Sequence, residues 1–305
     1  MSESVRELCG IAGALQIPFS DESAPMTGYI TANGLRMHYL DWGHSDKPNL
    51  LFLHGASLTA HTWDLVCLSL RSDYHCIALD QRGHGLTNGV HEFGLEQPRE
   101  DIRAAVASLG LKRFALVGMS LGGNNAIAYA GDQPEELAAV VFIDVCPSVL
   151  PDGYQDALDF EAKVEGRESL DAAVAAAVEH NPRGTPDYKR YTLGYSLTPD
   201  IEGRWQFRYH RTGVPQHTSE DMALYMARRR EKLWELVPKI HYPSLIVHGT
   251  ESRAQNRDNL WHFDKMLPNG RLVEISGAGH DVQEDQPARL VQILREFFRD
   301  IHYGQ

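Results

Sequence analysis

The segment Gly118-Met119-Ser120-Leu121-Gly122-Gly123 places the strongest constraint on how this chain can fold. It follows the apolar run 114–117 and precedes a helical pattern at 121–130. A strand that passes directly into a helix must turn so sharply that only small residues fit beside the central serine, and the flanking glycines meet that need. The turn would present the serine hydroxyl at the N-terminus of a helix, where unpaired N–H groups favour negative charge.

Apolar runs and helical patterns alternate along most of the chain. Strands are expected at 28–31, 36–39, 50–53, 75–79, 114–117, 139–143, 244–248 and 271–275, and helices at 61–70, 96–109, 121–130, 257–266 and 288–298. Asn33-Gly34 lies between the first two strands and predicts a hairpin. Continuous apolar runs suit a parallel sheet that is covered on both faces. The pattern therefore predicts an α/β fold with a doubly wound, mostly parallel sheet.

The alternation is interrupted in the second half of the chain. Residues 148–238 contain helical stretches and many aromatic residues but no convincing strand, so we expect a helical cap inserted into a core made of 26–147 and 239–305. Residues 1–25 lack clear periodicity and are interrupted by prolines, which predicts an N-terminal arm.

Composition excludes several classes of function. The 305 residues carry 29 Lys and Arg against 41 Asp and Glu, a net charge of −12, which argues against binding to nucleic acid or to an anionic membrane. No apolar stretch approaches the ~18–20 residues of a membrane helix. Four scattered cysteines and the absence of a signal-peptide pattern favour the cytoplasm. No metal-binding or nicotinamide-binding motif is present, so we expect no metal and no cofactor. The expected partner is a small-molecule substrate, and a homodimer is compatible with the sequence.

Four motifs occur in a fixed order: His54-Gly55-Ala56-Ser57, Asp80-Gln81-Arg82-Gly83-His84-Gly85, the serine turn, and Gly277-Ala278-Gly279-His280. Together they resemble the α/β-hydrolase superfamily from about residue 28 onward. The resemblance implies that Ser120 is the nucleophile and His280 the general base. It also implies that the backbone N–H groups of Ala56 and Leu121 form an oxyanion hole.

The acid of the expected triad departs from the common pattern. Most relatives place it at the position that is Ser252 here, and Ser252 cannot carry a negative charge. Asp144 ends the strand 139–143, where a minority of the superfamily has its acid, and is the preferred candidate to orient His280. Glu251 remains the alternative.

The segments around Asp144 and Ser252 are similar to those of the (E)-2-(acetamidomethylene)succinate hydrolases, a subgroup with the same acid placement. Cofactor-independent dioxygenases of this superfamily share that placement. We therefore expect a cofactor-free serine hydrolase that cleaves an ester, amide or activated carbonyl bond. A dioxygenase or lyase that uses the His–Asp pair as a base, and a ligand-binding receptor, are the alternatives. Tyr191, Trp205 and Tyr209 of the cap are expected to line a largely apolar substrate pocket.

Overall fold

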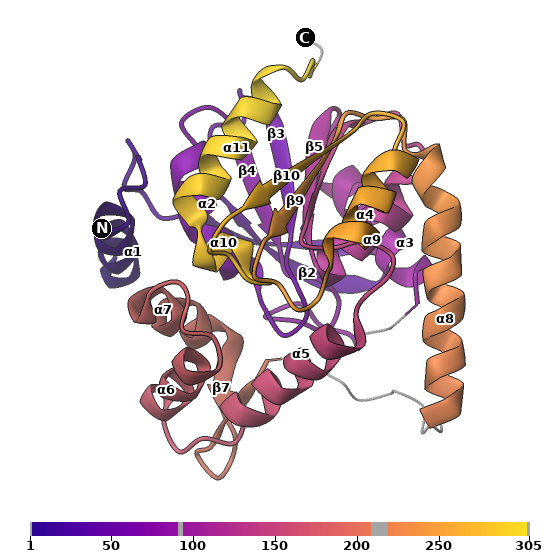
Figure 1. Ribbon diagram of the computed structural model, residues 1–305. Coiled ribbons are helices and arrows are strands. Elements are labelled where there is room, and N and C mark those ends of the chain that lie inside the picture. The colour runs from indigo at the N-terminus through magenta and orange to yellow at the C-terminus, as the bar shows by residue number, and fades with distance from the viewer. Residues whose placement is uncertain (1, 91–93, 209–218, 304–305) are drawn as a thin grey trace.

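The computed structural model describes residues 2–90, 94–208 and 219–303 (Figure 1). One eight-stranded sheet runs through these residues in the order β1-β2-β4-β3-β5-β6-β9-β10. Its strands are β1 (Met26–Ala32), β2 (Leu35–Asp41), β3 (Asn49–Leu53), β4 (His75–Leu79), β5 (Phe114–Met119), β6 (Leu137–Ile143), β9 (Ser244–Gly249) and β10 (Gly270–Ile275).

The sheet is parallel from β4 to β10, and the β1–β2 hairpin extends it antiparallel. Strands β5 and β6 are buried at every residue, as their continuous apolar sequences require when helices cover both faces. The hairpin turns at Asn33 and Gly34, both with positive φ, which matches the Asn-Gly prediction. The predicted doubly wound, mostly parallel fold is confirmed.

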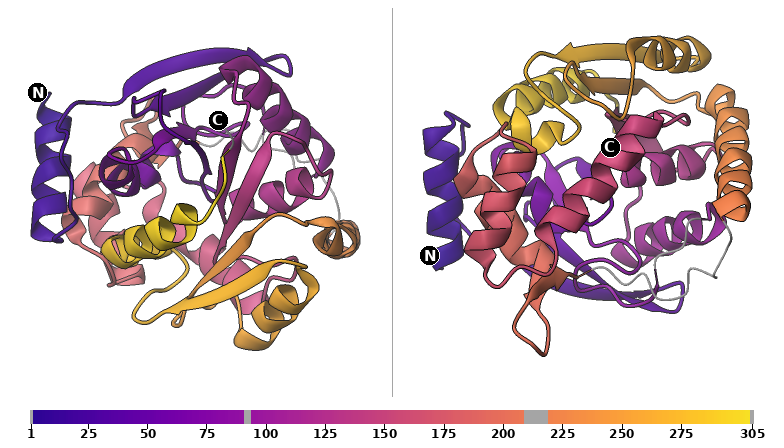
Figure 2. Two further views of the ribbon diagram at one scale, coloured as in Figure 1. Left: turned by 90° about the horizontal axis from the view of Figure 1, so that it is seen from above. Right: turned by 60° about the horizontal axis from the view of Figure 1, so that its bottom comes forward.

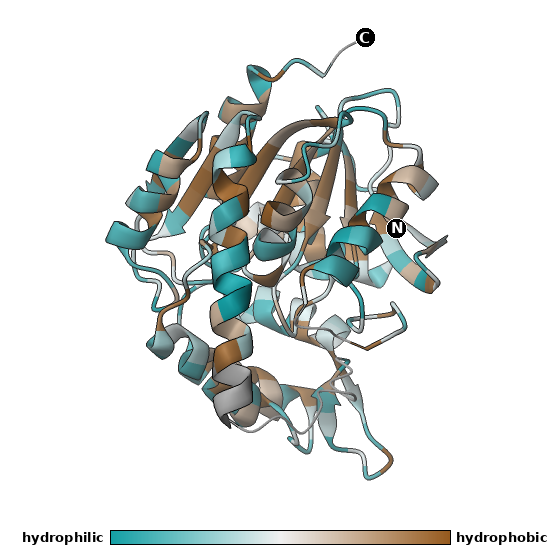
Figure 3. Cartoon of the chain, turned by 90° about the vertical axis from the view of Figure 1, so that its right-hand side faces the viewer, coloured by the Kyte–Doolittle hydropathy of each residue, from teal (hydrophilic) through white to brown (hydrophobic). Residues whose placement is uncertain are grey.

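Helices pack on the two faces of the sheet (Figure 1). One face is covered by α2 (Asp64–Leu70), α10 (Val282–Asp285) and α11 (Pro287–Arg299), and the other by α3 (Glu96–Leu109), α4 (Leu121–Ala130), α8 (Ser219–Leu236) and α9 (Arg257–Met266). Figure 3 shows the hydrophobic strands enclosed between helices whose outer faces are more polar. Within the described ranges, no helix combines the length and the apolar character needed to cross a bilayer.

The inserted segment lies beyond the carboxyl edge of the sheet. It contains α5 (Pro151–Val164), α6 (Leu170–His180), α7 (Pro186–Ser196) and a hairpin of β7 (Leu197–Pro199) and β8 (Trp205–Phe207). The right-hand view of Figure 2 shows α5 crossing over the sheet. Residues from these elements form a small hydrophobic core of their own.

Two features of the insertion differ from the sequence-based expectation. The hairpin was not expected, because strands of three residues are too short to produce a periodic signal. Helix α8 falls inside the predicted cap, but it runs beside the core and packs against α4 (Figure 1). Leu233 of α8 is fully buried in the core of the sheet domain.

The N-terminal arm contains helix α1 (Glu3–Ala14), where no periodicity was expected. Its buried residues Val5, Leu8, Ile11 and Ala12 form one face, which packs against both α2 of the core and α7 of the cap. Two glycines within the helix reduce its intrinsic helix propensity and obscured the pattern, and tertiary packing overrides that weak preference.

Candidate active site

Ser120 lies at a strained turn between β5 and α4. Its φ is 52° and its ψ is −112°, a conformation that L-residues rarely adopt and that concentrates at functional sites. The flanking glycines are sterically required. A Cβ on Gly118 would lie 2.4 Å from the carbonyl oxygen of Gly122, and a Cβ on Gly122 would lie 2.4 Å from that of Leu53. The predicted tight turn is therefore present in the structure.

Asp144 follows β6, the neighbour of β5, and also has a positive φ of 46°. Its side chain is fully buried, and its Oδ2 lies 2.6 Å from Nδ1 of His280. Because the carboxylate can only accept, the proton of a neutral His280 ring resides on Nδ1 and leaves Nε2 as a proton acceptor. The ring is about a third exposed (31%) and lines the cavity above the sheet.

Three further donors converge on the Asp144 carboxylate. Oδ1 lies 2.8 Å from Nδ1 of His248 and accepts a bond of 3.3 Å from the N–H of Gly249, while Oδ2 accepts a bond of 2.5 Å from the hydroxyl of Ser252. Ser252 occupies the position at which the acid was expected in most relatives, and its hydroxyl donates to Asp144, the preferred candidate. Glu251, in contrast, is half exposed (49%) and pairs with Arg183 of the cap at 2.6 Å.

Asp144 and His280 stabilise each other's charged forms. Burial raises the pKa of a carboxyl, but the hydrogen bonds from His248 and His280 outweigh it and hold the pKa of Asp144 below its usual value. Burial lowers the pKa of an imidazole, but the hydrogen bond and the charge of Asp144 outweigh it and raise the pKa of His280. The pair therefore favours the imidazolium that forms when the ring takes up a proton.

Two backbone N–H groups are available beside Ser120. Ala56 lies in the loop after β3, and Leu121 is the first residue of α4. Neither N–H group has a hydrogen-bond acceptor among the described residues. Both were predicted to form the oxyanion hole, and both N–H groups are free to bind a ligand oxygen.

A buried network holds the loop that carries Ala56. His54 sits in this loop, with its Nδ1 2.7 Å from the carbonyl oxygen of Gly55 and its Nε2 accepting from the N–H of Gln81 at 3.0 Å. The Gln81 amide donates to the His54 carbonyl at 2.6 Å and accepts from Asn125 of α4 at 2.8 Å. His54 therefore has a structural role, because both ring nitrogens are engaged.

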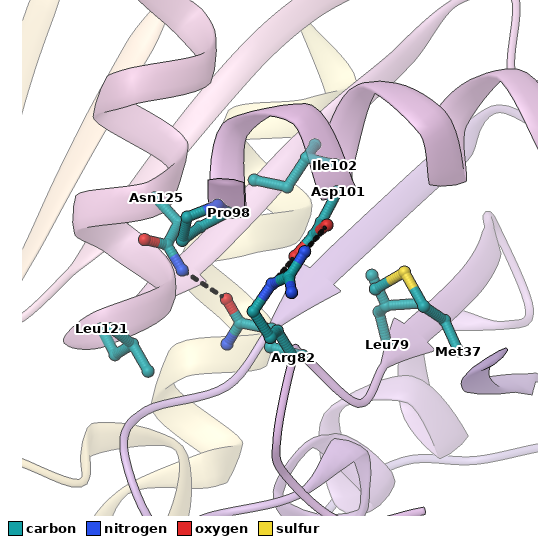
Figure 4. A pocket seen from close by; sticks show the side chains of 9 residues that line it. Met37, Leu79, Arg82, Pro98, Asp101, Ile102, Leu121 and Asn125 are labelled. Atoms are coloured by element: carbon teal, nitrogen blue, oxygen red, sulfur yellow. Dashed lines mark hydrogen bonds and ion pairs between the residues drawn. The ribbon is translucent and has the colours of Figure 1, made fainter. Parts of the chain in front are cut away.

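A small cavity lies next to this network and is shown in Figure 4. Its volume of about 20 Å³ has room for about one water molecule but not for a substrate. Arg82 and Asp101 close one side through two hydrogen bonds of 2.7 Å, and Asn125 bonds to Gln81 on another side (Figure 4). We infer that these residues stabilise the structure around the site and do not bind a substrate.

The cavity that includes Ser120 and His280 has a volume of about 330 Å³, near the lower end of the range for small-molecule sites. Its walls come from the loops after β3, β5, β9 and β10, and from α5, α7 and the segment that follows α6. Among the described residues, no hydrogen bond joins Ser120 Oγ to His280 Nε2. Such contacts are often long in free enzymes and shorten when substrate binds.

The cavity is more polar than the expected apolar pocket. Seven charged side chains line it: Asp156, Glu161, Arg183, Lys189, Glu251, Arg253 and Asp281. Several of them join the cap to the core, since Arg183 pairs with Glu251 at 2.6 Å and Arg253 with Asp156 at 3.1 Å. The Ser57 hydroxyl in the loop after β3 also bonds to Glu161 of α5.

The aromatic residues predicted to line the pocket lie elsewhere. Tyr191 is buried in the core and donates a hydrogen bond of 2.7 Å to Asp64. Trp205 belongs to the β7–β8 hairpin, and neither residue is among those that line the cavity. Tyr209 lies outside the described residues. Phe160 lines the cavity instead, and no hydropathy pattern distinguishes it from the aromatic residues that form the core of the cap.

Comparisons with known proteins give a consistent family relationship. A sequence model of the family described as the alpha/beta hydrolase fold matches residues 48–287. Esterase Rv0045c of Mycobacterium tuberculosis is 28% identical over 271 residues, covering 84% of each chain. The 2-(acetamidomethylene)succinate hydrolase of Mesorhizobium japonicum is 27% identical over 254 residues, covering 82% of this chain and 87% of that protein.

Solved structures give the same fold. The structure of E-2-(acetamidomethylene)succinate hydrolase superposes with a TM-score of 0.77 at 23% identity, covering 90% of this chain and 99% of that one. The structure of esterase Rv0045c superposes with a TM-score of 0.75 at 23% identity, covering 98% of both chains.

Proposed function

Because the chain belongs to the α/β-hydrolase fold family, we propose that it is a serine hydrolase that cleaves an ester, amide or activated carbonyl bond of a small molecule. The observation that carries this proposal is the strained Ser120 in the same cavity as a His280 ring held by the buried Asp144. The names of the similar proteins, an esterase and a hydrolase, agree with hydrolysis.

The proposed reaction proceeds through an acyl-enzyme. Ser120 Oγ attacks the carbonyl carbon while His280 Nε2 takes the hydroxyl proton, and the carbonyl electrons move to the oxygen. The N–H groups of Ala56 and Leu121 stabilise this oxyanion. The intermediate then collapses, the bond to the leaving group breaks, and His280 returns the proton to the leaving group. Water, deprotonated by the same ring, releases the acid and restores Ser120.

Asp144 is the proposed acid because its carboxylate lies directly on His280 Nδ1, whereas Glu251 pairs with Arg183. In this role Asp144 holds the ring in the tautomer that leaves Nε2 free and stabilises the imidazolium. Backbone contacts fix both residues, since the N–H of Ser120 bonds to the carbonyl of Ile143 and the N–H of Asp144 bonds to that of Val247.

The test is to compare Ser120→Ala with the wild type on an activated ester. We expect kcat to fall by several orders of magnitude with the fold intact, as in other enzymes whose nucleophile is removed. A fluorophosphonate should label the wild type and a Ser108→Ala control, a change on the surface of α3, but not Ser120→Ala. An ester and an anilide with the same acyl group would then show which bond is cleaved faster.

Near-normal turnover by Ser120→Ala would refute the proposal. It would instead favour a reaction in which the His–Asp pair acts as a base without an acyl-enzyme, as in the dioxygenase or lyase alternative. Tight ligand binding by the wild type without turnover would favour a receptor.

A further inference from the structure

Lys189 of α7 is a buried cation that forms no direct ion pair among the described residues. Only 6% of the residue is exposed, and it lines the same cavity as Ser120 and His280. Among the described residues, Lys189 Nζ has no hydrogen bond and no carboxylate within ion-pair distance. The two arginines that line the cavity differ from it, because Arg183 pairs with Glu251 and Arg253 pairs with Asp156.

Two buried acidic residues, Glu284 and Asp285, interact electrostatically with Lys189, but neither forms an ion pair or hydrogen bond with its ammonium group. Asp285 accepts hydrogen bonds from the N–H of Gly279 at 2.7 Å and from the Asn181 amide at 3.1 Å. Glu284 accepts a hydrogen bond of 3.1 Å from Thr62, and burial raises its pKa to about 7 although the charge of Lys189 acts in the opposite direction. Near neutral pH, Glu284 therefore supplies only part of a negative charge.

A mostly buried ammonium group that forms no direct ion pair or hydrogen bond is poorly compensated, because buried charges in proteins are normally paired. An anion that enters the cavity would supply a direct partner for Lys189, since Arg183 and Arg253 are already paired. Two further lining carboxylates, Glu161 and Asp281, oppose another negative charge, so the preference depends on direct contact with Lys189. Because Lys189 and Ser120 line one cavity of about 330 Å³, a single small molecule can contact both.

We propose that Lys189 binds a carboxylate group of the substrate and thereby selects carboxylate-bearing esters or amides. This inference rests on the proposed hydrolase function. A carboxylate is favoured over a phosphate because a lone ammonium is a point charge that balances a monoanion, whereas the two cavity arginines, whose forked donors suit phosphate, are occupied. The contact would position the scissile carbonyl over Ser120, so Lys189 is a specificity-determining residue.

The experiment uses matched pairs of activated esters and the full-length chain. Mono-p-nitrophenyl esters of glutaric, adipic and pimelic acid carry the charge on the acyl side, and p-nitrophenyl pentanoate, hexanoate and heptanoate are their neutral controls. Acetoxybenzoates and acetoxybenzamides form the corresponding pair for the leaving-group side. The value of kcat/KM is measured for the wild type, Lys189→Met and Lys189→Arg.

We expect the wild type to prefer the charged member in at least one series. Lys189→Met should lower kcat/KM for that ester by about 10- to 100-fold, which corresponds to the loss of one hydrogen bond to a charged group. It should leave the neutral ester unchanged, and Lys189→Arg should retain most of the preference. Labelling of Ser120 by a fluorophosphonate in each variant shows that the nucleophile and fold are intact.

Two results would overturn the inference. One is a wild type with no preference for the charged ester in either series, a result that does not depend on whether any variant folds. The other is an equal loss on charged and neutral esters in Lys189→Met, which indicates a structural role. If the wild type hydrolyses neutral esters without preference, only this inference fails. If it hydrolyses no ester and Ser120 is not labelled, the proposed function fails.

Discussion

Replacing Asp144 by Asn tests which residue supplies the acid of the proposed triad. The variant is nearly isosteric, but it presents one oxygen and one NH₂ group to four donors that now share two carboxylate oxygens. If the NH₂ group faces His280, Nδ1 must accept, the ring proton moves to Nε2, and the ring cannot take the proton of Ser120. A wrong tautomer of this kind lowers kcat by about 10⁴-fold in a serine protease, and we expect a loss of about 10³–10⁴-fold here.

The pH dependence provides a second readout. His280 must be neutral to act as a base, so kcat/KM rises with pH through its pKa. Burial lowers that pKa, but Asp144 outweighs burial and raises it in the wild type. In Asp144→Asn the charge of Asp144 is lost, but burial still lowers the pKa of His280. The rising limb of the kcat/KM profile should therefore move to lower pH.

Glu251→Gln is the matched control, because Glu251 is half exposed and pairs with Arg183. Both variants are assayed on one p-nitrophenyl ester from pH 5 to 9, with circular dichroism to verify folding. We expect Glu251→Gln to keep the profile of the wild type. The assignment is wrong if folded Asp144→Asn retains kcat within about tenfold of the wild type, or if Glu251→Gln loses as much.

Two further predictions concern stability. Ser252→Ala removes a hydrogen bond to the buried Asp144 carboxylate and should lower the free energy of unfolding, measured in urea, by about 1.5–3 kcal/mol. Ser252→Thr keeps the hydroxyl and should lose less stability. Equal stability of Ser252→Ala and the wild type would contradict this prediction. Glu284→Gln should be more stable than the wild type at pH 8, and the difference should shrink toward pH 5. Burial raises the pKa of Glu284 to about 7, so its carboxyl favours folding only while protonated, and stability is lost as pH rises through that value. The free energy of unfolding is measured by denaturant titration at pH 8 and at pH 5. A Glu284→Gln variant that is less stable than the wild type at pH 8 would contradict the raised pKa of Glu284.

The sequence predicted the fold and the serine turn well because each depends on local or strongly periodic features. Fully apolar strands such as β5 and β6 indicate a sheet covered on both faces, and the sterically required glycines identify the turn around Ser120. Asp144 was preferred as the acid from its position at a strand end, and its contact with His280 supports that preference.

The composition of the cavity could not be predicted in the same way. Tyr191 and Phe160 are both aromatic residues of cap helices, but one packs in the core and the other lines the cavity. Which side of the cap faces the sheet depends on tertiary packing between segments far apart in sequence. Lys189 illustrates the same point, because a single lysine in a helix ordinarily indicates a solvent-exposed face.

The position of Asp144 directly after β6 has a consequence for how this enzyme could diversify. The strand before Asp144, the proposed acid, is hydrogen-bonded to the strand before Ser120, the proposed nucleophile, so the geometry between them is set by the interior of the sheet. The loop after β9 therefore does not need to hold a carboxylate next to His280. Its residues Glu251 and Arg253 pair with the cap residues Arg183 and Asp156 instead. Changes at those two positions can reshape the cavity that both residues line, while the relative positions of Ser120 and Asp144 are kept.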